Sequence, residues 1–592
     1  MKLGHFILFV LMVVRLNSQS IHIISNQNFT DLVADEVIRN GGNDSLFLSL
    51  KNIPVTYAMS SLINGRDLQN TVNDNNKSKF ISDYFEYYKP LRVSKEAQLL
   101  YIDSTNTFYT LEETSYANSQ YEIEESKPLL RYFYKNRAHF LQYNSEDFKI
   151  SIDPIVNLRY GKDSENDNIL FQNTRGVKIR GLIDNKVYFY TSIYENQAKF
   201  NNYVDSYIAK FAVIPSNGTY KSYDSSVIEN LNGVDFHNAQ AFVGVPISKH
   251  IAIEFGHGRH KIGNGYRSML LSDFAQNYFY LRLNTQVWKF HYQNIFAELN
   301  PISARLNPGD NLLPKKYMAS HYLAYKPHKR FEIGLYESVV FDRVDHFEFN
   351  YLNPIILYRS VEQFLDSPDN VLIGINASWI PLNRVQVYGQ FLLDEFKFNE
   401  LKSDRGWWAN KYAIQIGAKV VEPFGIKNLV IQAEYNTATP YTYTHHRPLA
   451  IDSTYSTASY TNQGQSLAHP LGANFKEIMA LVRFQPISRL SMQFKAFLIE
   501  QGEDAPGEFY GANINIPNTQ RIMDYGNYTL QGIKAKTMLM EVNLSYEFFR
   551  NYYFDFDFIY RKKDSEMDSR DMLTNYIGGG IRINMDRYTF DF

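Results

Sequence analysis

The feature that most constrains the fold is an alternation of apolar and polar side chains with a period of two. It begins at Phe148 and continues to the last residue of the chain. The clearest examples lie in the segments 385–393, 429–436, 552–561 and 576–585. In YYFDFDFIYR (552–561), for instance, phenylalanines alternate with aspartates. Such alternation indicates strands with one apolar and one polar face.

Short turns join these strands in pairs. Four segments place a proline, two residues and a base before an alternating strand, which is typical of tight hairpins; they are 245–255, 326–336, 380–390 and 485–495. Four further short turns are predicted at Asp184–Lys186, Asn284–Thr285, Glu422–Lys427 and Phe549–Asn551. The connections between hairpins are long and polar, for example 198–236, 342–370, 397–410, 438–475 and 499–534.

Short turns at one end and long loops at the other are typical of a bacterial outer-membrane barrel. A soluble sandwich also alternates, but it does not need short turns along one whole edge. Eight short turns join sixteen strands, and an opening strand at 148–160 and a closing strand at 576–592 bring the total to about eighteen. The prediction is therefore an all-β, transmembrane antiparallel barrel over residues 148–592. Phe592 resembles the aromatic terminal signal of such barrels.

The part before the barrel has two predicted pieces. Residues 1–20 carry Lys2 before the apolar run 6–14, as in a cleaved secretory signal peptide. Residues 21–147 are polar and form an N-terminal periplasmic segment, partly helical over Asn28–Asn40. The run 6–14 is too short to span a bilayer, and no later segment approaches about 20 apolar residues, so a helical membrane protein is excluded.

Composition removes several function classes. The formal net charge is −2 and the pI is about 6.7, so nucleic acid is not an expected partner. The chain has no cysteine, which excludes disulfides and cysteine-based metal sites. No metal or other cofactor is expected, and the expected partners begin with outer-membrane lipid.

The stretch GHGRHKIGNGYRSMLLSDF (256–274) combines four glycines with five basic or imidazole side chains. It fits no dinucleotide fingerprint, because Lys261 stands where the third glycine is needed. Pairing Ser268 with His257 or His260 would suggest a hydrolase, but chance explains such a pair better, so no catalytic residues are assigned. Two interpretations stay open: lumen charges paired with carboxylates, or contact with an anionic polymer. Arg267 is expected to contact ligand and Arg259 to be structural; the candidates are Arg259, His260, Lys261, Tyr266 and Arg267.

A second candidate loop is TPYTYTHHRP (439–448). Its aromatic, imidazole and guanidinium groups suit carbohydrate on an exposed loop, although they equally suit packing at a loop base. The residues concerned are Tyr441, Tyr443, His445, His446 and Arg447.

The segments 256–299 and 466–477 (SLAHPLGANFKE) resemble the Wzi-like capsule-assembly family of outer-membrane proteins. The resemblance covers roughly 148–592 and is greatest to the branch of gliding Bacteroidetes that includes the gliding-motility protein RemB. It implies an 18-stranded barrel, a small helical periplasmic piece, and a non-enzymatic role in binding or organising surface exopolysaccharide or in gliding motility. The alternatives are a porin-like channel or a subunit of an envelope secretion or motility complex.

Overall fold

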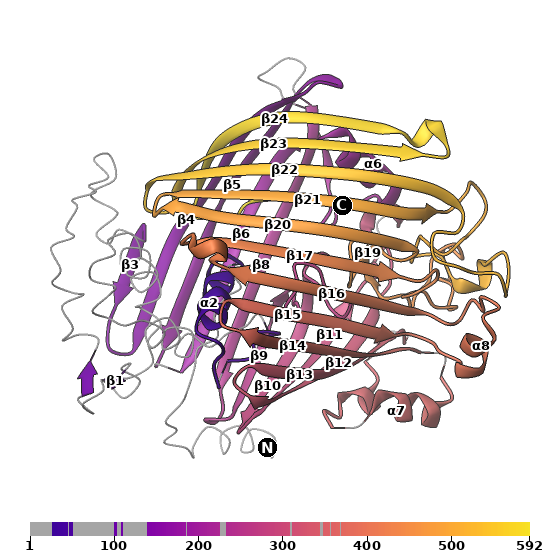
Figure 1. Ribbon diagram of the computed structural model, residues 1–592, viewed down its shortest axis with the longest axis horizontal. Coiled ribbons are helices and arrows are strands. Elements are labelled where there is room, and N and C mark those ends of the chain that lie inside the picture. Colours follow the sequence, from indigo (N-terminus) through magenta and orange to yellow (C-terminus); the bar gives the residue numbers. More distant parts are fainter. Residues whose placement is uncertain are drawn as a thin grey trace.

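A computed structural model describes residues 27–50, 100–102, 108–110 and 139–592, apart from 45, 185, 225–231, 308, 310, 344–346, 356 and 368. The predicted signal peptide at 1–20 lies outside these residues. The described chain forms one closed antiparallel barrel of eighteen wall strands (Figure 1). The fold class and the strand number expected from the turns are thereby confirmed.

The wall strands follow one another in chain order, so each pairs with its sequence neighbours. They are β4 (Phe148–Asp163), β5 (Asn166–Ile183), β6 (Val187–Lys199), β8 (Asn232–Pro246), β9 (Ile251–Gly258), β10 (Tyr278–Val287), β11 (Phe290–Leu299), β12 (Lys316–His328), β13 (Phe331–Phe341), β14 (Asn370–Leu382), β15 (Val385–Leu393), β16 (Tyr412–Val421), β17 (Leu429–Ala438), β20 (Phe475–Ile487), β21 (Leu490–Glu503), β22 (Ile533–Phe549), β23 (Tyr552–Ser565) and β24 (Met572–Ile583).

Short strands and helices lie outside this series. The strands are β1 (Leu100–Ile102), β2 (Phe108–Thr110), β3 (Leu141–Asn144), β7 (Lys221–Asp224), β18 (Thr461–Asn462) and β19 (Gln465–Ser466). The helices are α2 (Gln27–Arg39), α6 (Asn202–Phe211), α7 (Tyr358–Leu365) and α8 (Phe398–Ser403). Among the described residues, no helix is long and apolar enough to cross a bilayer.

The barrel closes where β24 pairs with β4, from Tyr576 opposite Asp163 to Ile583 opposite Val156. The two backbones approach closely at Gly580, where a Cβ atom would lie 2.1 Å from the carbonyl oxygen of Leu158. Glycine is therefore required at this point of the seam.

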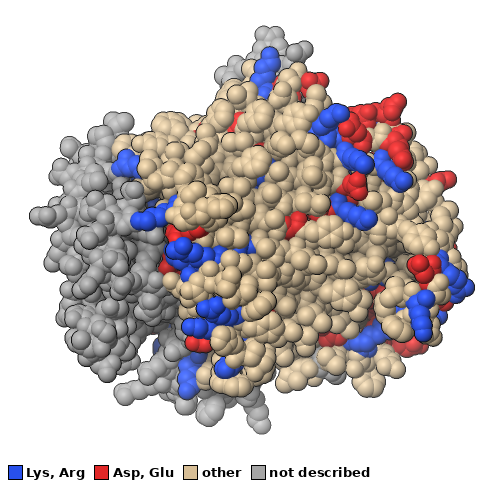
Figure 2. Space-filling model, viewed as in Figure 1, with Lys and Arg blue, Asp and Glu red and all other residues tan. Residues whose placement is uncertain are grey.

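The two faces of the wall are the reverse of those in a soluble sheet. On β23, Phe554 and Phe556 are exposed on the outside, whereas Asp555 and Asp557 are buried toward the lumen. The same split holds for exposed Ile577 beside buried Arg582 on β24 and for the other strands with period-two alternation. On the face that Figure 2 shows, charged side chains gather mainly toward the two ends of the strands, with a largely uncharged band between them. Lipid can therefore contact the apolar face while polar groups line the interior.

Seven of the eight predicted short turns are found where expected, whereas the eighth turn and the end of the closing strand were predicted wrongly. Asn284 and Thr285 lie within β10, and the turn follows at Trp288 and Lys289. Asn284 faces the lumen, where its side chain accepts a hydrogen bond from Gln293 at 2.9 Å. The closing strand ends at Ile583 rather than 592, because the remaining residues turn into the barrel.

Helix α2, which overlaps the helix expected at 28–40, lies at the short-turn end of the barrel against β15 and β16 (Figure 1). The carboxylate of Asp35 accepts hydrogen bonds from Arg483 at 3.0 and 3.1 Å, and Lys419 lies 3.8 Å from it. Asp31 adds a second contact to Arg483 at 3.4 Å. One polar face of the helix is thus fixed to charges on the lumen side of the wall.

The largest hydrophobic cluster of the described residues lies inside the lumen. Four segments distant in sequence fill it: α2 with residues 46–50, the β9–β10 loop (259–277), the β17–β20 loop (439–474) and residues 584–592. Core side chains from the first three pack together and against the wall, among them Leu50, Ile262, Leu270, Tyr443 and Leu467. These segments occupy the space that would otherwise form a pore.

Candidate functional site

Two cavities lie in the lumen on either side of residues 584–592, which we call the tail. The outer cavity, of about 450 Å³, is bordered by α6 and by the long-loop ends of β21, β23 and β24. The inner cavity, of about 340 Å³, extends from the β9–β10 loop to the short turn at Arg550 and Asn551. Phe592 borders the outer cavity and Asp591 the inner one, so the tail separates them.

The tail is held by ionic and aromatic contacts. The Asp591 carboxylate accepts hydrogen bonds from Arg267 at 3.0 Å, from Lys495 at 3.2 Å and from the Tyr266 hydroxyl. Burial raises the pKa of Asp591, but Lys495 and Arg267 outweigh burial and hold the pKa well below its usual range. The carboxylate therefore stays charged at neutral pH, and it fixes the tail to two parts of the barrel.

Aromatic packing holds the last residue of the tail. The Phe592 ring centroid lies 4.9 Å from that of Tyr207, 5.9 Å from Tyr203 and 6.0 Å from Phe274. The first two belong to α6 and the third to the β9–β10 loop. Phe592, which the sequence suggested as a terminal strand residue, therefore packs within the lumen.

Arg267 is buried and saturated by protein partners. Its Nε and Nη2 donate to Glu477 at 3.3 and 3.2 Å, its Nη1 donates to Asp591, and its Nη2 also donates to the Asp591 carbonyl. Arg259 is only half-buried, borders the inner cavity, and donates to the Ser216 carbonyl at 3.4 Å. The geometry favours the opposite assignment of roles to the one expected from the sequence: Arg267 is structural, and Arg259 faces open space.

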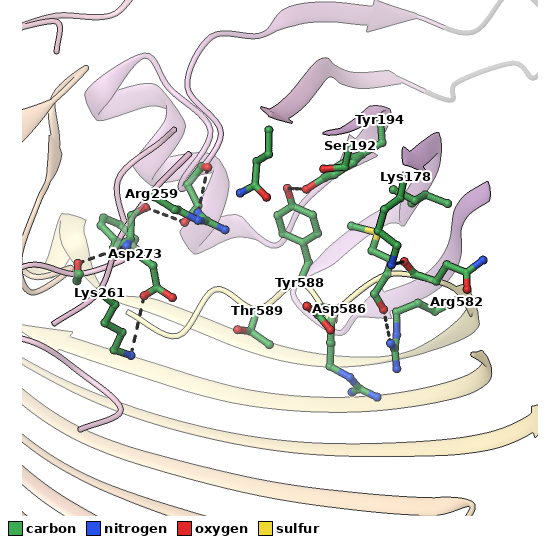
Figure 3. Close-up of a pocket in the computed structure, with 18 of the residues that line it drawn as sticks. Lys178, Ser192, Tyr194, Arg259, Lys261, Asp273, Arg582, Asp586, Tyr588 and Thr589 are labelled. Atoms are coloured by element: carbon green, nitrogen blue, oxygen red, sulfur yellow. Dashed lines mark hydrogen bonds and ion pairs between the residues drawn. The ribbon is translucent and has the colours of Figure 1, made fainter. Parts of the chain in front are cut away.

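The other candidates of the stretch 256–274 also divide into residues that border the inner cavity and residues that are buried by protein. Lys261 borders the inner cavity, donates to the Tyr266 carbonyl at 2.7 Å and lies 3.9 Å from Asp273 (Figure 3). Tyr266 also borders this cavity, but its hydroxyl donates a hydrogen bond to Asp591. His260 is buried, with its ring edge on Tyr280, and burial lowers its pKa well below the usual value. A neutral imidazole of this kind contributes no charge for an anion.

The inner cavity has a cationic lining. Eight basic and three acidic side chains border it. Arg582 and Arg587 are paired with Asp555 behind the surface, at 2.7 and 3.0 Å. Figure 3 places Lys178 and Arg259 on opposite sides of Tyr588, with Ser192 and Tyr194 on the wall nearby. Cations, hydroxyls and phenol rings thus face one space.

The outer cavity combines aromatic, charged and amide groups. Helix α6 forms because Tyr203, Val204 and Ile208 share one face, which is buried against the wall. Its other side turns Tyr207, Lys210 and Phe211 to the cavity. Opposite the helix, Glu503 is paired with Lys563 at 2.6 Å and with Arg570 at 3.0 Å. The polar lining also includes Asp504, Arg561, Asn513 and Asn515.

The second candidate loop is less exposed than expected. Tyr441 and Tyr443 are fully buried at positive φ (65° and 73°), and their hydroxyls donate to the carbonyls of Phe509 and Met269. Burial lowers the pKa of His445 well below, and that of His446 below, the usual value, so both rings are neutral at pH 7. Arg447 is half-buried and pairs with Asp342 at 2.7 Å. These five residues lie at the base of a loop that folds into the barrel mouth.

The structure offers little support for hydrolytic or metal chemistry. Ser268 donates to the carbonyl oxygen of Ile262 at 2.6 Å, while His257 and His260 bond to Ala239 and Tyr278. Within the described part of the chain, no three His, Asp or Glu side chains are grouped closely enough to hold a metal ion.

Sequence reasoning missed the outer cavity. The amphipathic segment 202–211 inside a long loop was a usable signal for α6. Nothing in the sequence joins this segment to Glu503, Lys563 and Arg570, because all three lie far along the chain from α6 and only barrel closure brings them beside it.

A closed eighteen-stranded wall with an apolar outer face and a polar lumen defines an outer-membrane β-barrel. The sequence profile of the family described as capsule assembly protein Wzi matches residues 160–552, and the chain belongs to this family. No curated protein sequence matches the chain.

Among the similar solved structures, Wzi and OprD are described as outer membrane proteins. The Escherichia coli protein Wzi, described as a carbohydrate-binding β-barrel involved in group 1 capsule assembly, is 13% identical, with a TM-score of 0.44 over 74% of this chain and 85% of that one. OprD of Pseudomonas aeruginosa is 11% identical, with a TM-score of 0.40 over 73% and 93%. OccAB2 of Acinetobacter baumannii is 8% identical, with a TM-score of 0.40 over 73% and 97%. Similarity at these identities and TM-scores does not indicate which ligand this chain binds.

Proposed function

We propose that this protein is a non-enzymatic receptor that binds an exported polysaccharide at its outer cavity and helps to organise it on the cell surface. The observation that carries the proposal is the outer cavity itself, in which aromatic rings, amides and paired charges face the long-loop end of the barrel. Membership of a family named for capsule assembly also supports a role with surface polysaccharide.

The chemistry of the lining favours an acidic saccharide. Aromatic rings stack on sugar faces, and guanidinium and ammonium groups bind carboxylates. Four basic side chains border the cavity, against the two carboxylates of Glu503 and Asp504. Lys210 is exposed at the rim of the cavity and extends from α6, so it is well placed to meet a sugar carboxylate.

A role in gliding motility, with envelope motility or secretion proteins as partners, is the finer form of this proposal. It rests on the resemblance of 256–299 to the RemB branch. We keep the division into a signal peptide (1–20), a periplasmic segment (21–147) and a barrel (148–592) as part of the same proposal, with the difference that α2 and residues 46–50 of the second part lie inside the lumen. Co-purification with envelope proteins from a gliding cell tests the partner component.

The porin-like channel is the second candidate, and the filled lumen weighs against it. Segments from four parts of the described chain occupy the lumen, and side chains from three of them form a packed core. Planar-bilayer recordings test this alternative directly. The proposal expects no stable conductance steps, whereas large, reproducible openings would favour transport.

Binding to purified polysaccharides tests the leading proposal. Lys210→Glu should weaken binding of an acidic polysaccharide several-fold while leaving a neutral one little changed. Lys402→Glu is the matched control, because Lys402 is also an exposed lysine near the end of a short helix in a long loop. Equal effects of the two variants would remove the outer cavity from the proposal.

A further inference from the structure

One long connection lies on the outside of the wall. Residues 347–355 and 357–365 of the β13–β14 connection, which we call the flap, contain a 3₁₀ turn (Phe349–Leu352) and helix α7. Helix α7 contacts β13 and β14 and lies near the long-loop end in Figure 1. The buried flap side chains Tyr351, Tyr358 and Val361 pack on the wall residues Phe296, Tyr317, Ala319, Val339, Phe341 and Val371.

Those wall residues face away from the lumen. Val339 and Phe341 alternate in phase with Leu335, which is 56% exposed on the outer face. The flap therefore covers part of the surface that continues the lipid-facing belt.

Beneath the flap, this outer face carries a charged residue. Glu337 follows Leu335 on the same face of β13, and it pairs across the sheet with Ile373 of β14, which is 47% exposed. Its position lies within the apolar belt, where an ionisable group facing lipid is costly. Glu337 is nevertheless only 7% exposed, because the flap covers it.

The flap satisfies this carboxylate directly. The first backbone N–H groups of α7, those of Tyr358 and Arg359, donate to Glu337 at 3.0 and 3.1 Å. These donors belong to the positive end of the helix and have no partner within it. His321 lies 3.1 Å from Glu337, and its ring stacks on Tyr358 at 3.8 Å. A polar cluster on the wall thus fixes the flap in place.

The outer side of the flap is largely apolar. Four large side chains point away from the protein: Phe349 (81% exposed), Ile355 (83%), Leu357 (66%) and Phe364 (83%). Exposed apolar groups concentrated in this way usually mark an interaction surface. They continue the exposed belt of Leu335, Ile373 and Ile375.

We propose that the flap lies within the outer leaflet and is a lipid-binding element, with these four side chains among lipid acyl chains. The polar side chains Arg359 and Gln363 border the same surface and face the headgroups, as in helices that lie at a membrane interface. The cluster at Glu337 holds the flap against the wall, and lipid covers its other side. This inference is independent of polysaccharide binding.

Because the chain has no cysteine, a single introduced cysteine can be labelled with a nitroxide at one known position. The variants are Phe364→Cys and Phe349→Cys, with Leu335→Cys as the lipid-facing control and Leu312→Cys, which is 95% exposed in the β11–β12 loop, as the aqueous control. Each is purified, reconstituted into phospholipid vesicles and examined by electron paramagnetic resonance. The measurement is collision with oxygen, which partitions into lipid, relative to a water-soluble nickel complex.

The oxygen-to-nickel ratio at 364 and 349 should match that at 335 and exceed that at 312 several-fold. A ratio equal to that at 312 would place the flap in water and overturn the proposal. Low collision with both reagents would mean that a second copy of the chain covers the flap, which also overturns it. All four positions are exposed, so the labels should not disturb folding.

A second variant tests the attachment. Glu337→Ala in the Phe364→Cys background removes the acceptor for α7, so the label should become more mobile and α7 more sensitive to protease. The matched control is Glu348→Ala, which removes a carboxylate from the same loop without touching the α7 N–H groups. Unchanged mobility in Glu337→Ala would refute the role of this cluster.

Discussion

Removing Arg267 should destabilise the barrel by an amount that follows from its contacts. Arg267→Gln breaks the paired hydrogen bonds to Glu477 and the contacts to Asp591, all of them buried. Breaking a buried ion pair by removing one partner costs about 3–5 kcal/mol. Here each carboxylate keeps another partner, since His469 lies 3.0 Å from Glu477 and Lys495 lies 3.2 Å from Asp591. We therefore expect a loss of about 3 kcal/mol, at the lower end of that range.

Equilibrium urea unfolding in lipid vesicles measures this loss. The control is Lys315→Gln, which breaks a partly exposed pair with Glu298 at 3.0 Å and should cost at most about 1 kcal/mol. Adding Glu477→Gln to Arg267→Gln should recover part of the lost stability, because a neutral amide then replaces the buried carboxylate that has lost its arginine partner. The reasoning is refuted if Arg267→Gln costs no more than the control, or if the double variant is less stable by the sum of both single losses.

Three further outcomes are expected. Ile577→Arg should reduce the assembled barrel, seen as loss of the heat-modifiable band on gels, because a charge at the lipid face costs about 2–4 kcal/mol near the midplane; Ile577→Leu should assemble normally. Arg259→Gln should leave barrel abundance unchanged, since its contact is a carbonyl at 3.4 Å, whereas a loss equal to that of Arg267→Gln would show that Arg259 is structural. Because the pKa of Asp591 is lower in the folded state than its value of about 3.9 in an unfolded chain, its contribution is fully present above pH about 3.9 and falls as the pH drops toward the folded value. Residues 584–592 should then resist pepsin at pH 5 and become susceptible only in stronger acid.

The wall of the barrel could be predicted from the sequence because its signal is local. Each strand carries its own alternation, and proline, asparagine and basic residues mark the turns. The error at Asn284–Thr285 has a physical cause: an asparagine reads as a turn residue, but in a polar lumen it is an ordinary strand residue. The end of β24 was missed because the tail alternates like the strand before it.

The candidate site was less predictable because its contacts are long-range. Sequence pointed to Arg259 and Arg267 together, but their different roles depend on Glu477 and Asp591, which lie 210 and 324 residues beyond Arg267. Tyr441 and Tyr443 resembled surface binding residues, yet their loop folds inward and buries them. The flap could not be anticipated either, since the only sequence sign was an unexplained glutamate on an apolar strand face.

The filled lumen also sets the direction from which a polymer can arrive. The packed core of the inward loops fills part of the lumen, and residues 584–592 separate the inner cavity from the outer one, so we do not expect a saccharide chain to be delivered through this barrel from the periplasm while both stay in place. Any polymer that reaches the outer cavity approaches from outside the cell. The protein would then act downstream of a separate exporter, receiving polymer after its release.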